Sequence, residues 1–235
     1  MSNGDSIVTE SPVRAAIVDY GLGNLFSVLH ASRHSGIDAF ITSSPQEIAE
    51  ANAVILPGVG AFADAMSCLN RLDLAQPLKD YSQSGKPLFG ICLGLQLLLT
   101  ESEEFGSTRG LDIIPGTVKR FHEPKDAEGR LLKIPHVGWN RSVPPAGRAN
   151  GWKGTPLEPL GNEAMMYFVH SFYVTPDNEE FVLSKTTYGD QEFCSSIHKD
   201  QTFAFQFHPE RSGEEGIQVY RKIREIISEA HSPIS

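Results

Sequence analysis

The sequence predicts an α/β protein with an open, mostly parallel, twisted sheet that has helices on both faces. Three observations support this class. In the first half of the chain, apolar runs of strand length alternate with stretches of helical spacing, a pattern typical of βαβ units. These runs are apolar throughout, as expected of parallel strands buried on both faces. Three glycine-bearing turns follow them, and parallel sheets place their sites beyond such strand ends.

In the first half of the chain, predicted strands and helices alternate. Ser44, Pro45 and Glu47 match a capping box with proline in the first turn, which predicts that the second helix begins there. Strands are expected over 14–20, 39–42, 53–56 and 87–92, and helices from 25, from 45, over 62–70 and over 74–82.

The second half is richer in β structure. From Gly213 to Ala230, the spacing of Ile217, Tyr220 and Ile223 predicts a closing amphipathic helix. The region between 124 and 161 is dense in proline and glycine and is expected to be mostly loop with extended pieces. Short strands are expected near 116–121, 165–174, 181–187, 193–198 and 202–207.

Composition limits the function before any motif is considered. The chain has 235 residues, 40% of them hydrophobic and 21% charged, which is enough for a sizeable core. Its formal net charge is −9, from 20 basic and 29 acidic residues, and it contains no long basic run. We therefore expect neither nucleic acid nor a membrane as a partner. Residues 1–12 are expected to be a loose tail, and residues 13–232 a single domain.

Cysteine content gives further expectations. The cysteines are Cys68, Cys92 and Cys194, a sparse and odd set that indicates a reducing, cytoplasmic location without a disulfide framework. Their spacing, with no clustered histidines, predicts no metal site and no cofactor. No apolar run approaches the roughly 20 residues that span a bilayer, so no membrane segment is expected. The longest run, around 91–99, is expected to be the end of a strand followed by a helix.

The stretch over 90–94, Gly-Ile-Cys-Leu-Gly, places a single cysteine between two glycines. This form predicts an elbow, in which a strand delivers a nucleophile, Cys92, to a sharp turn above a helix N-terminus. The glycines would let neighbouring backbone pass close by, and the helix end would stabilise a thiolate. Alone, the motif fits equally well a buried core cysteine in a strand-to-helix turn.

The stretch His208-Pro209-Glu210 supplies the partners that a cysteine nucleophile needs. Pro209 favours an extended His208, and residues two apart on an extended chain point the same way. We therefore expect Glu210 to hold one ring nitrogen of His208 while the other faces Cys92. Taken alone, the motif could also be a strand-end histidine beside a solvated glutamate.

Acyl transfer also needs N–H donors for an oxyanion. Leu93, directly after the nucleophile, supplies one. The glycine-flanked turn over 57–60 can supply another, from Val59 or Gly60. An ordinary strand-to-helix connection is the alternative interpretation of this turn.

Together these stretches resemble a known family. Residues 90–96 with the distant 208–210 resemble the class I (triad) glutamine amidotransferases. Within that class, five further stretches are similar to the glutaminase subunits of imidazole glycerol phosphate synthases: 19–25, 56–62, 134–140, 167–173 and 205–210. The resemblance runs from Arg14 to Ala230, and its small departures at Leu95, Asp112 and Arg211 leave the triad intact.

The resemblance implies a reaction and a set of site residues. It implies a glutaminase that hydrolyses L-glutamine to glutamate and ammonia through a thioester. Cys92 would attack the carboxamide, His208 would move protons and Glu210 would orient His208. The oxyanion would be bound by the backbone of Val59, Gly60 and Leu93, and the glutamine by Gly58, Gln96, Ser171 and Phe172.

The resemblance also implies a partner. In this family, ammonia passes through a tunnel to a separate (β/α)8-barrel cyclase subunit, which makes imidazole glycerol phosphate and AICAR in histidine biosynthesis. The free glutaminase would be nearly inactive, with the Val59 N–H pointing the wrong way until the partner and its ligand bind. The positions that match the interface are Asn24, His136, Trp139, Asn140 and Tyr167.

Three alternative functions stay open at this point. The glutaminase of another synthase, such as anthranilate or aminodeoxychorismate synthase, would lack the Pro-His-x-Gly-Trp-Asn stretch at 135–140. A non-catalytic binding or stress protein would use Cys92 as a redox-sensing thiol. An esterase of the hydrolase type would turn over esters without any partner.

Overall fold

The computed structural model describes residues 13–231, and the tail expected over 1–12 lies outside the described residues. The strands are β1 (Arg14–Val18), β2 (Asp38–Thr42), β3 (Ala53–Gly58), β4 (Leu88–Cys92), β5 (Leu99–Ser102), β6 (Thr108–Arg109), β7 (Ile114–Arg120), β8 (His136–Val143), β9 (Ala164–His170), β10 (Phe172–Pro176), β11 (Val182–Tyr188), β12 (Gln191–Lys199) and β13 (Thr202–Phe205). The helices are α1 (Leu25–His34), α2 (Pro45–Glu50), α3 (Phe62–Arg71), α4 (Ala75–Gln83), α5 (Leu93–Leu97) and α6 (Gly213–His231), with 3₁₀ turns η1 (Glu158–Leu160), η2 (Glu179–Phe181) and η3 (Pro209–Arg211).

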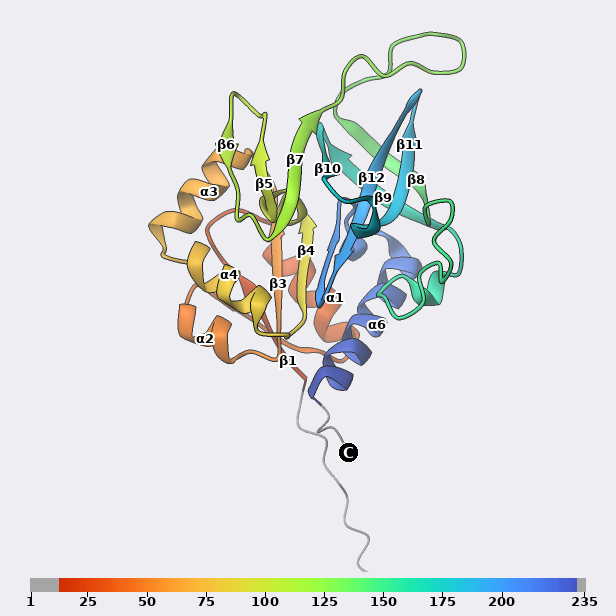
Figure 1. The fold of residues 1–235 in the computed structure, drawn as a ribbon. Coiled ribbons are helices and arrows are strands. Elements are labelled where there is room, and N and C mark those ends of the chain that lie inside the picture. The colour runs from red at the N-terminus through yellow and green to blue at the C-terminus, as the bar shows by residue number, and fades with distance from the viewer. Residues whose placement is uncertain (1–12, 232–235) are drawn as a thin grey trace, which may run out of the picture.

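Across residues 13–231, thirteen strands join in one open sheet with helices packed around it (Figure 1). The main path runs β2-β1-β3-β4-β13-β12-β10-β7-β5-β6, and β11, β8 and β9 branch from β12. The pairs from β2 to β13 along this path are parallel. The predicted α/β class with an open sheet is therefore confirmed, and the second half adds the expected β-rich elements, mostly as antiparallel strands.

Strand β1 shows why the helices lie on both faces of the sheet. Ala15 and Ile17 join one apolar core with residues of α1 and α6. Ala16 and Val18 join the other core, with residues of α2, α3, α4 and α5. Because successive side chains of a strand point to opposite faces, a strand that is apolar throughout needs a helical layer on each side.

The register of the parallel strands brings three connections to one edge of the sheet. Gly58 of β3 pairs with Cys92 of β4, and Ile91 of β4 pairs with Phe205 of β13. The residues that leave these strand ends are therefore neighbours, although more than a hundred positions separate Cys92 from His208. The candidate site is built at this carboxyl edge.

Two local predictions need correction. Ser44 caps α2, accepting the Glu47 N–H at 3.4 Å, but the box is not closed, because the Glu47 carboxylate bonds the Thr42 hydroxyl instead. The Ser44 N–H also goes to the Thr42 hydroxyl, at 2.9 Å. The helix after the elbow, α5, has only five residues. The apolar run then enters β5 at Leu99, because β5 pairs with β7 and is held in the sheet.

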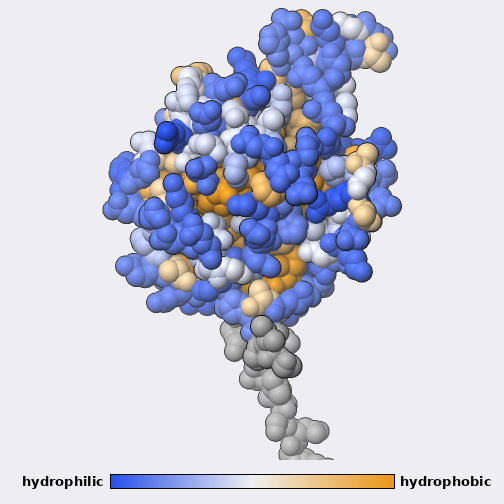
Figure 2. Space-filling model, viewed as in Figure 1, coloured by the Kyte–Doolittle hydropathy of each residue, from blue (hydrophilic) through white to orange (hydrophobic). Residues whose placement is uncertain are grey.

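The region between 124 and 161 contains loops, as expected, and also the eight-residue strand β8. The loop between β7 and β8 projects beyond the carboxyl edge of the sheet, and its tip is mainly hydrophilic (Figures 1 and 2). Asp126 and Arg130 form an ion pair of 2.7 Å within it. Among the described helices, none combines the length and apolar character needed to cross a membrane.

Candidate active site

Cys92 stands at the junction of β4 and α5. It is the N-cap of α5, and its φ of +54° lies in the left-handed region. That conformation is uncommon for a residue with a Cβ, and it marks a constrained turn of the kind that presents a nucleophile. Cys92 is 6% exposed. The strand, turn and helix expected around it are present.

Close packing explains the two glycines that flank the cysteine. A Cβ on Gly94 would lie 1.8 Å from the carbonyl oxygen of Leu56, and a Cβ on Gly90 would lie 3.0 Å from the Ala204 Cβ. Both glycines have ordinary negative φ values, so their role is to admit neighbouring atoms. Helix α5 can lie against β3 only because residue 94 has no side chain.

His208 and Glu210 form a buried pair. His208 Nδ1 lies 2.8 Å from Glu210 Oε1, and the two side chains are 4% and 1% exposed. The expected pairing is present and His208 is extended, as predicted. The chain does not stay extended to Glu210, because Pro209–Arg211 forms the turn η3. The Ser212 hydroxyl donates to the His208 carbonyl at 2.7 Å and closes this turn.

The second ring nitrogen of His208, Nε2, is buried and has no hydrogen-bond partner among residues 13–231. Burial lowers the pKa of His208, but the nearby Cys92 sulfur, followed by Glu210, outweighs burial and raises the pKa well above its ordinary value. The charges of Cys92 and Glu210 therefore both act on the imidazole. This arrangement favours a protonated imidazole beside the Cys92 sulfur, which suits the proton donor of a cysteine-based reaction.

A cavity of about 310 Å³ opens beside Cys92. It brings together the turn over 57–60, the elbow and the segment 169–172, which are distant in sequence. The residues that line it are Val59, Gly60, Cys92, Leu93, Gln96, Glu104, Pro135, Val169, His170, Ser171 and Phe172.

Gly58, expected among the glutamine-binding residues, does not line this cavity. It lies within β3, where a Cβ would be 2.1 Å from the Tyr20 hydroxyl. That hydroxyl donates to the Pro57 carbonyl at 2.9 Å. Gly58 therefore packs against Tyr20 behind the turn. Its role in binding glutamine stays a prediction.

Gln96 lines the cavity, and its amide nitrogen is bound to the protein. Its Nε2 donates to the Phe172 carbonyl at 3.1 Å and to Gln206 Oε1 at 3.2 Å. Both amide hydrogens are thus engaged, so the remaining atom, Oε1, is available to accept from a ligand.

Glu104 lines the cavity and was missed by the sequence analysis. Its carboxylate accepts the backbone N–H of Phe62 at 2.6 Å. It therefore caps α3, which has no side-chain cap of its own, and ties the helix to the segment after β5. The carboxylate comes from a run of acidic residues, and nothing in that run distinguishes it from its solvated neighbours.

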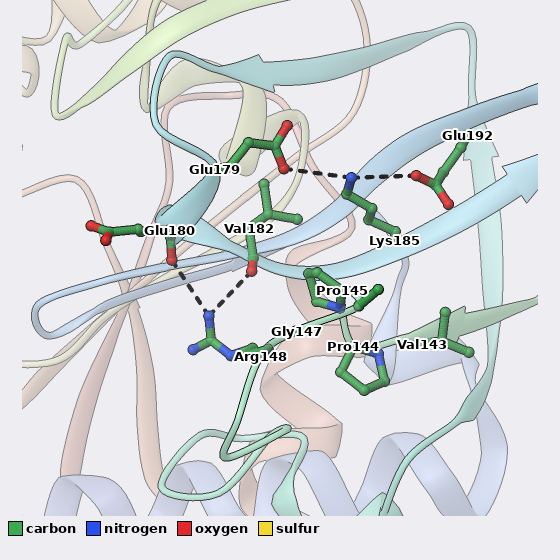
Figure 3. A pocket seen from close by; sticks show the side chains of 11 residues that line it. Val143, Pro144, Pro145, Gly147, Arg148, Glu179, Glu180, Val182, Lys185 and Glu192 are labelled. Carbon is green, nitrogen blue, oxygen red and sulfur yellow. Dashed lines mark hydrogen bonds and ion pairs between the residues drawn. The ribbon is translucent and has the colours of Figure 1, made fainter.

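A larger cavity, of about 660 Å³, lies between residues 143–148, η2 and strands β11 and β12 (Figure 3). Lys185 Nζ lies 3.4 Å from Glu179 and 3.3 Å from Glu192, and Arg148 donates to the Val182 carbonyl at 3.2 Å. Lys185 is therefore paired within the wall, and the residues that line this cavity in the described chain include no cysteine, serine or histidine. Within residues 13–231, no group of three or more His, Cys, Asp or Glu residues is placed to hold a metal ion.

Comparisons with known proteins agree with this geometry. A family model described as glutamine amidotransferase class-I matches residues 16–223. The chain belongs to the class-I glutamine amidotransferase family. A relative named "Imidazole glycerol phosphate synthase subunit HisH", from Geobacter sulfurreducens, is 42% identical over 217 residues, 91% of this chain and 99% of its own. The relative of the same name from Chlorobium luteolum is 43% identical over 209 residues, 89% of this chain and 98% of its own.

Solved structures give the same fold at lower identity. The structure of PurLQS from Thermotoga maritima aligns with a TM-score of 0.67 and 18% identity, over 91% of this chain and 98% of that one. A crystal structure of a glutamine amidotransferase aligns with a TM-score of 0.66, 18% identity and coverage of 90% and 98%. At these identities the likeness concerns the fold alone.

In this amidotransferase, the β8–β9 hairpin presents aromatic residues to the surface. Trp139 is 54% exposed, and its ring lies 6.2 Å from that of Tyr167, edge to face. The Arg211 guanidinium lies 4.5 Å from the Tyr167 ring centre, which links the hairpin to the turn that holds Glu210. Asn24 is exposed at the start of α1. The interface assigned to these residues stays a prediction.

His136, also expected at an interface, is only 3% exposed and cannot offer a surface for docking. Its position in the hairpin turns the ring inward, where it joins a chain of hydrogen bonds. Asn140 Nδ2 donates to His136 Nε2 at 3.2 Å, and His136 Nδ1 donates to His170 Nε2 at 3.1 Å. His170 Nδ1 then donates to the Phe172 carbonyl at 2.8 Å. Both imidazoles must be neutral for this chain to form, because each uses one nitrogen as an acceptor.

The buried histidines predict a pH dependence of stability. Burial lowers the pKa of His136 from 6.5 to about 4 and, as the largest influence, that of His170 from 6.5 to about 3. Below pH 6.5 the unfolded chain binds protons that the folded chain excludes, so the two histidines stabilise the fold above that pH and lose their contribution as the pH falls toward 4. The expected slope is at most roughly 1.4 kcal/mol per pH unit for each histidine.

Urea unfolding at a series of pH values measures this slope. His136→Asn removes one of the two titrating groups, so its free energy of unfolding should fall less steeply than that of wild type. His122→Asn replaces an exposed histidine and should leave the slope unchanged. Equal slopes for wild type and His136→Asn would contradict the buried neutral state.

Proposed function

We propose that this chain is the glutaminase subunit of imidazole glycerol phosphate synthase, acting as one domain over residues 13–232. The observation that supports it is the buried Cys92, His208 and Glu210 constellation beside a cavity of about 310 Å³. The relatives at 41–43% identity that bear the name of that synthase subunit support the choice of synthase. A cytoplasmic location suits a free nucleophilic thiol, because reducing conditions keep it from forming disulfides.

The first half of the reaction forms a thioester. The Cys92 thiolate attacks the carboxamide carbon of glutamine, and the carbonyl oxygen takes the negative charge. The backbone N–H of Leu93, with that of Val59 or Gly60, stabilises this oxyanion. His208 Nε2 gives its proton to the departing nitrogen, so the C–N bond breaks and ammonia leaves.

The second half releases glutamate. His208, now neutral, takes a proton from a water molecule, and the resulting hydroxide attacks the thioester carbon. The C–S bond breaks, glutamate leaves and the thiolate–imidazolium pair is restored. Glu210 keeps Nδ1 occupied at 2.8 Å throughout, so Nε2 is the nitrogen that exchanges protons.

The cavity wall fits the polar groups of glutamine. Gln96 Oε1 can accept from a substrate N–H donor, and the Glu104 carboxylate adds negative charge near a substrate ammonium group. The backbone of Ser171 and Phe172 also lines the cavity and can meet the substrate carboxylate.

The partner is the (β/α)8-barrel cyclase subunit that uses the ammonia. The exposed Trp139, beside the half-buried Tyr167, offers an aromatic anchor of the kind that protein interfaces favour. Partner binding would rotate the peptide group of Val59, in the turn over 57–60. The Val59 N–H would then face the oxyanion only in the complex.

The decisive experiment mixes the chain with purified candidate synthase subunits and measures glutamine-dependent product formation. Imidazole glycerol phosphate should form only with the cyclase subunit. Turnover with an anthranilate or aminodeoxychorismate synthase subunit instead would show that the chain is the glutaminase of that synthase. Ester hydrolysis without a partner would indicate an esterase, and no turnover with any subunit would favour a non-catalytic role.

Trp139→Ala is expected to weaken binding of the cyclase about 30-fold, since truncation of a central aromatic anchor costs roughly 2 kcal/mol. Its stability should change little, because the ring is 54% exposed. Calorimetric titration of the cyclase measures the affinity. Leu72→Ala, at the far end of α3 and 37% exposed, is a control that should bind like wild type. An unchanged affinity and intact coupling in Trp139→Ala would place the interface elsewhere.

A further inference from the structure

Gln206 lies directly beside the nucleophile. It follows β13, whose register pairs Phe205 with Ile91, so the next residues along the two strands are Gln206 and Cys92. Gln206 is 0% exposed, and its Nε2 donates to Cys92 Sγ at 3.7 Å. Its backbone N–H donates to the Ser195 carbonyl at 2.9 Å, which fixes the residue to β12.

The neighbours of Gln206 determine which end of its amide faces the sulfur. Gln96 Nε2 donates to the Phe172 carbonyl at 3.1 Å, and that carbonyl can only accept. The NH₂ group of Gln96 also lies 3.2 Å from the side-chain amide of Gln206, and it needs an acceptor there. Gln206 must give its oxygen to Gln96, which leaves its NH₂ group to face Cys92.

We propose that Gln206 is a further catalytic residue, whose side-chain N–H stabilises the Cys92 thiolate. A hydrogen bond to a charged acceptor is roughly twice as strong as one to a neutral group. The N–H therefore favours the thiolate over the thiol, in surroundings where burial works against charge. The role of Gln206 in glutamine turnover rests on the proposed function. The effect of Gln206 on the reactivity of the Cys92 thiolate does not depend on it.

The amide complements His208 in two ways. His208 changes its charge during the reaction, whereas an amide does not titrate and offers the same donor at every stage. Gln206 also joins the sulfur to Gln96, which lines the cavity. A ligand that fixes Gln96 thereby fixes the donor to Cys92, so occupancy of the cavity and the position of the nucleophile are coupled.

Gln206→Met tests the proposal, because methionine has a similar length and no N–H. Purified full-length chain is alkylated with iodoacetamide across the neutral and alkaline range, and the Cys92-containing peptide is quantified by mass spectrometry. The rate at neutral pH should fall about tenfold, with the midpoint of the rate profile about one pH unit higher. Gln191→Met removes an amide at the start of β12 that donates to the His122 carbonyl and not to Cys92, and should react like wild type. A wild-type profile in Gln206→Met overturns the proposal.

A second variant and a second assay keep the result clear. Gln206→Asn shortens the side chain by one methylene, which draws the amide away from the sulfur and keeps the residue polar. This variant replaces Gln206→Met in the test if circular dichroism shows that Gln206→Met is unfolded. It should show the same slowing, and an unchanged profile would again overturn the proposal. Glutaminase turnover with the cyclase present should fall about tenfold in either variant. If wild type does not hydrolyse glutamine, the proposed function fails, while the alkylation profiles still decide the role of Gln206.

Discussion

Cys92→Ala should lower glutamine hydrolysis by at least about four orders of magnitude, even with the cyclase subunit present. Without the sulfur no thioester can form, and the remaining donors only position the substrate. The measurement is glutamate release from the complex at saturating glutamine. Assembly with the partner should persist, because residue 92 is only 6% exposed and the substitution changes little of the surface.

Cys194→Ala is the matched control for this change. Cys194 is 7% exposed in β12, and its thiol donates to the Ser196 carbonyl at 3.3 Å. Burial raises the pKa of the Cys194 thiol far above its ordinary value, so it stays protonated and unreactive. Its alanine variant should keep wild-type turnover. Full turnover in Cys92→Ala would refute the assignment of the nucleophile.

Gly94→Ala is expected to destabilise the fold by at least about 3 kcal/mol, at the upper end of the cost of overpacking. The new Cβ would lie 1.8 Å from the Leu56 carbonyl oxygen. That oxygen belongs to β3, which is fully buried between β1 and β4 and cannot move aside. Urea unfolding measures the loss, which should be accompanied by loss of activity because α5 begins at the nucleophile.

Alanine at two other glycines should cause smaller losses of stability, so these variants serve as controls. Gly90→Ala brings a Cβ to 3.0 Å from the Ala204 Cβ and to 3.1 Å from backbone atoms of Gly94 and Leu95. These atoms need to move by much less than Leu56 would for Gly94→Ala, so the expected cost is about 1 kcal/mol. Gly85→Ala meets no atom within 4 Å but has a φ of +78°, so its cost, also about 1 kcal/mol, comes from the backbone alone. Equal stabilities of Gly94→Ala and Gly90→Ala would contradict the close approach of α5 to β3.

Local sequence signals predicted the elements well where a single segment determines its own structure. Continuous apolar runs gave the parallel strands, and the spacing of Ile217, Tyr220 and Ile223 gave α6. The signals failed where a neighbour competes. Thr42 takes the Glu47 carboxylate that a closed capping box would use, and pairing with β7 draws Leu99 out of the helix into β5.

The candidate site shows the same division. Motifs located Cys92, His208 and Glu210, because the chemistry needs these residue types. The contact of Gln206 with the sulfur depends on the register of β13 against β4, and the capping of Phe62 by Glu104 depends on where the segment after β5 folds. Neither contact can be predicted from the local sequence. The inward turn of His136 likewise follows from the pairing of β8 with β9.

The turn over 57–60, proposed to bind the oxyanion, is held at both ends. Gly58 is fixed within β3, the Phe62 N–H is held by Glu104 at 2.6 Å, and the Ala61 carbonyl accepts the Ala65 N–H at 3.1 Å. Only residues 59 and 60 lie between these ties. Val59 is 41% exposed and belongs to neither apolar core. A peptide bond can rotate inside so short a span without disturbing the sheet or α3. In the proposed mechanism, substitutions at Val59 would therefore change how strictly turnover depends on the partner, while the folding free energy of the domain stays almost unchanged.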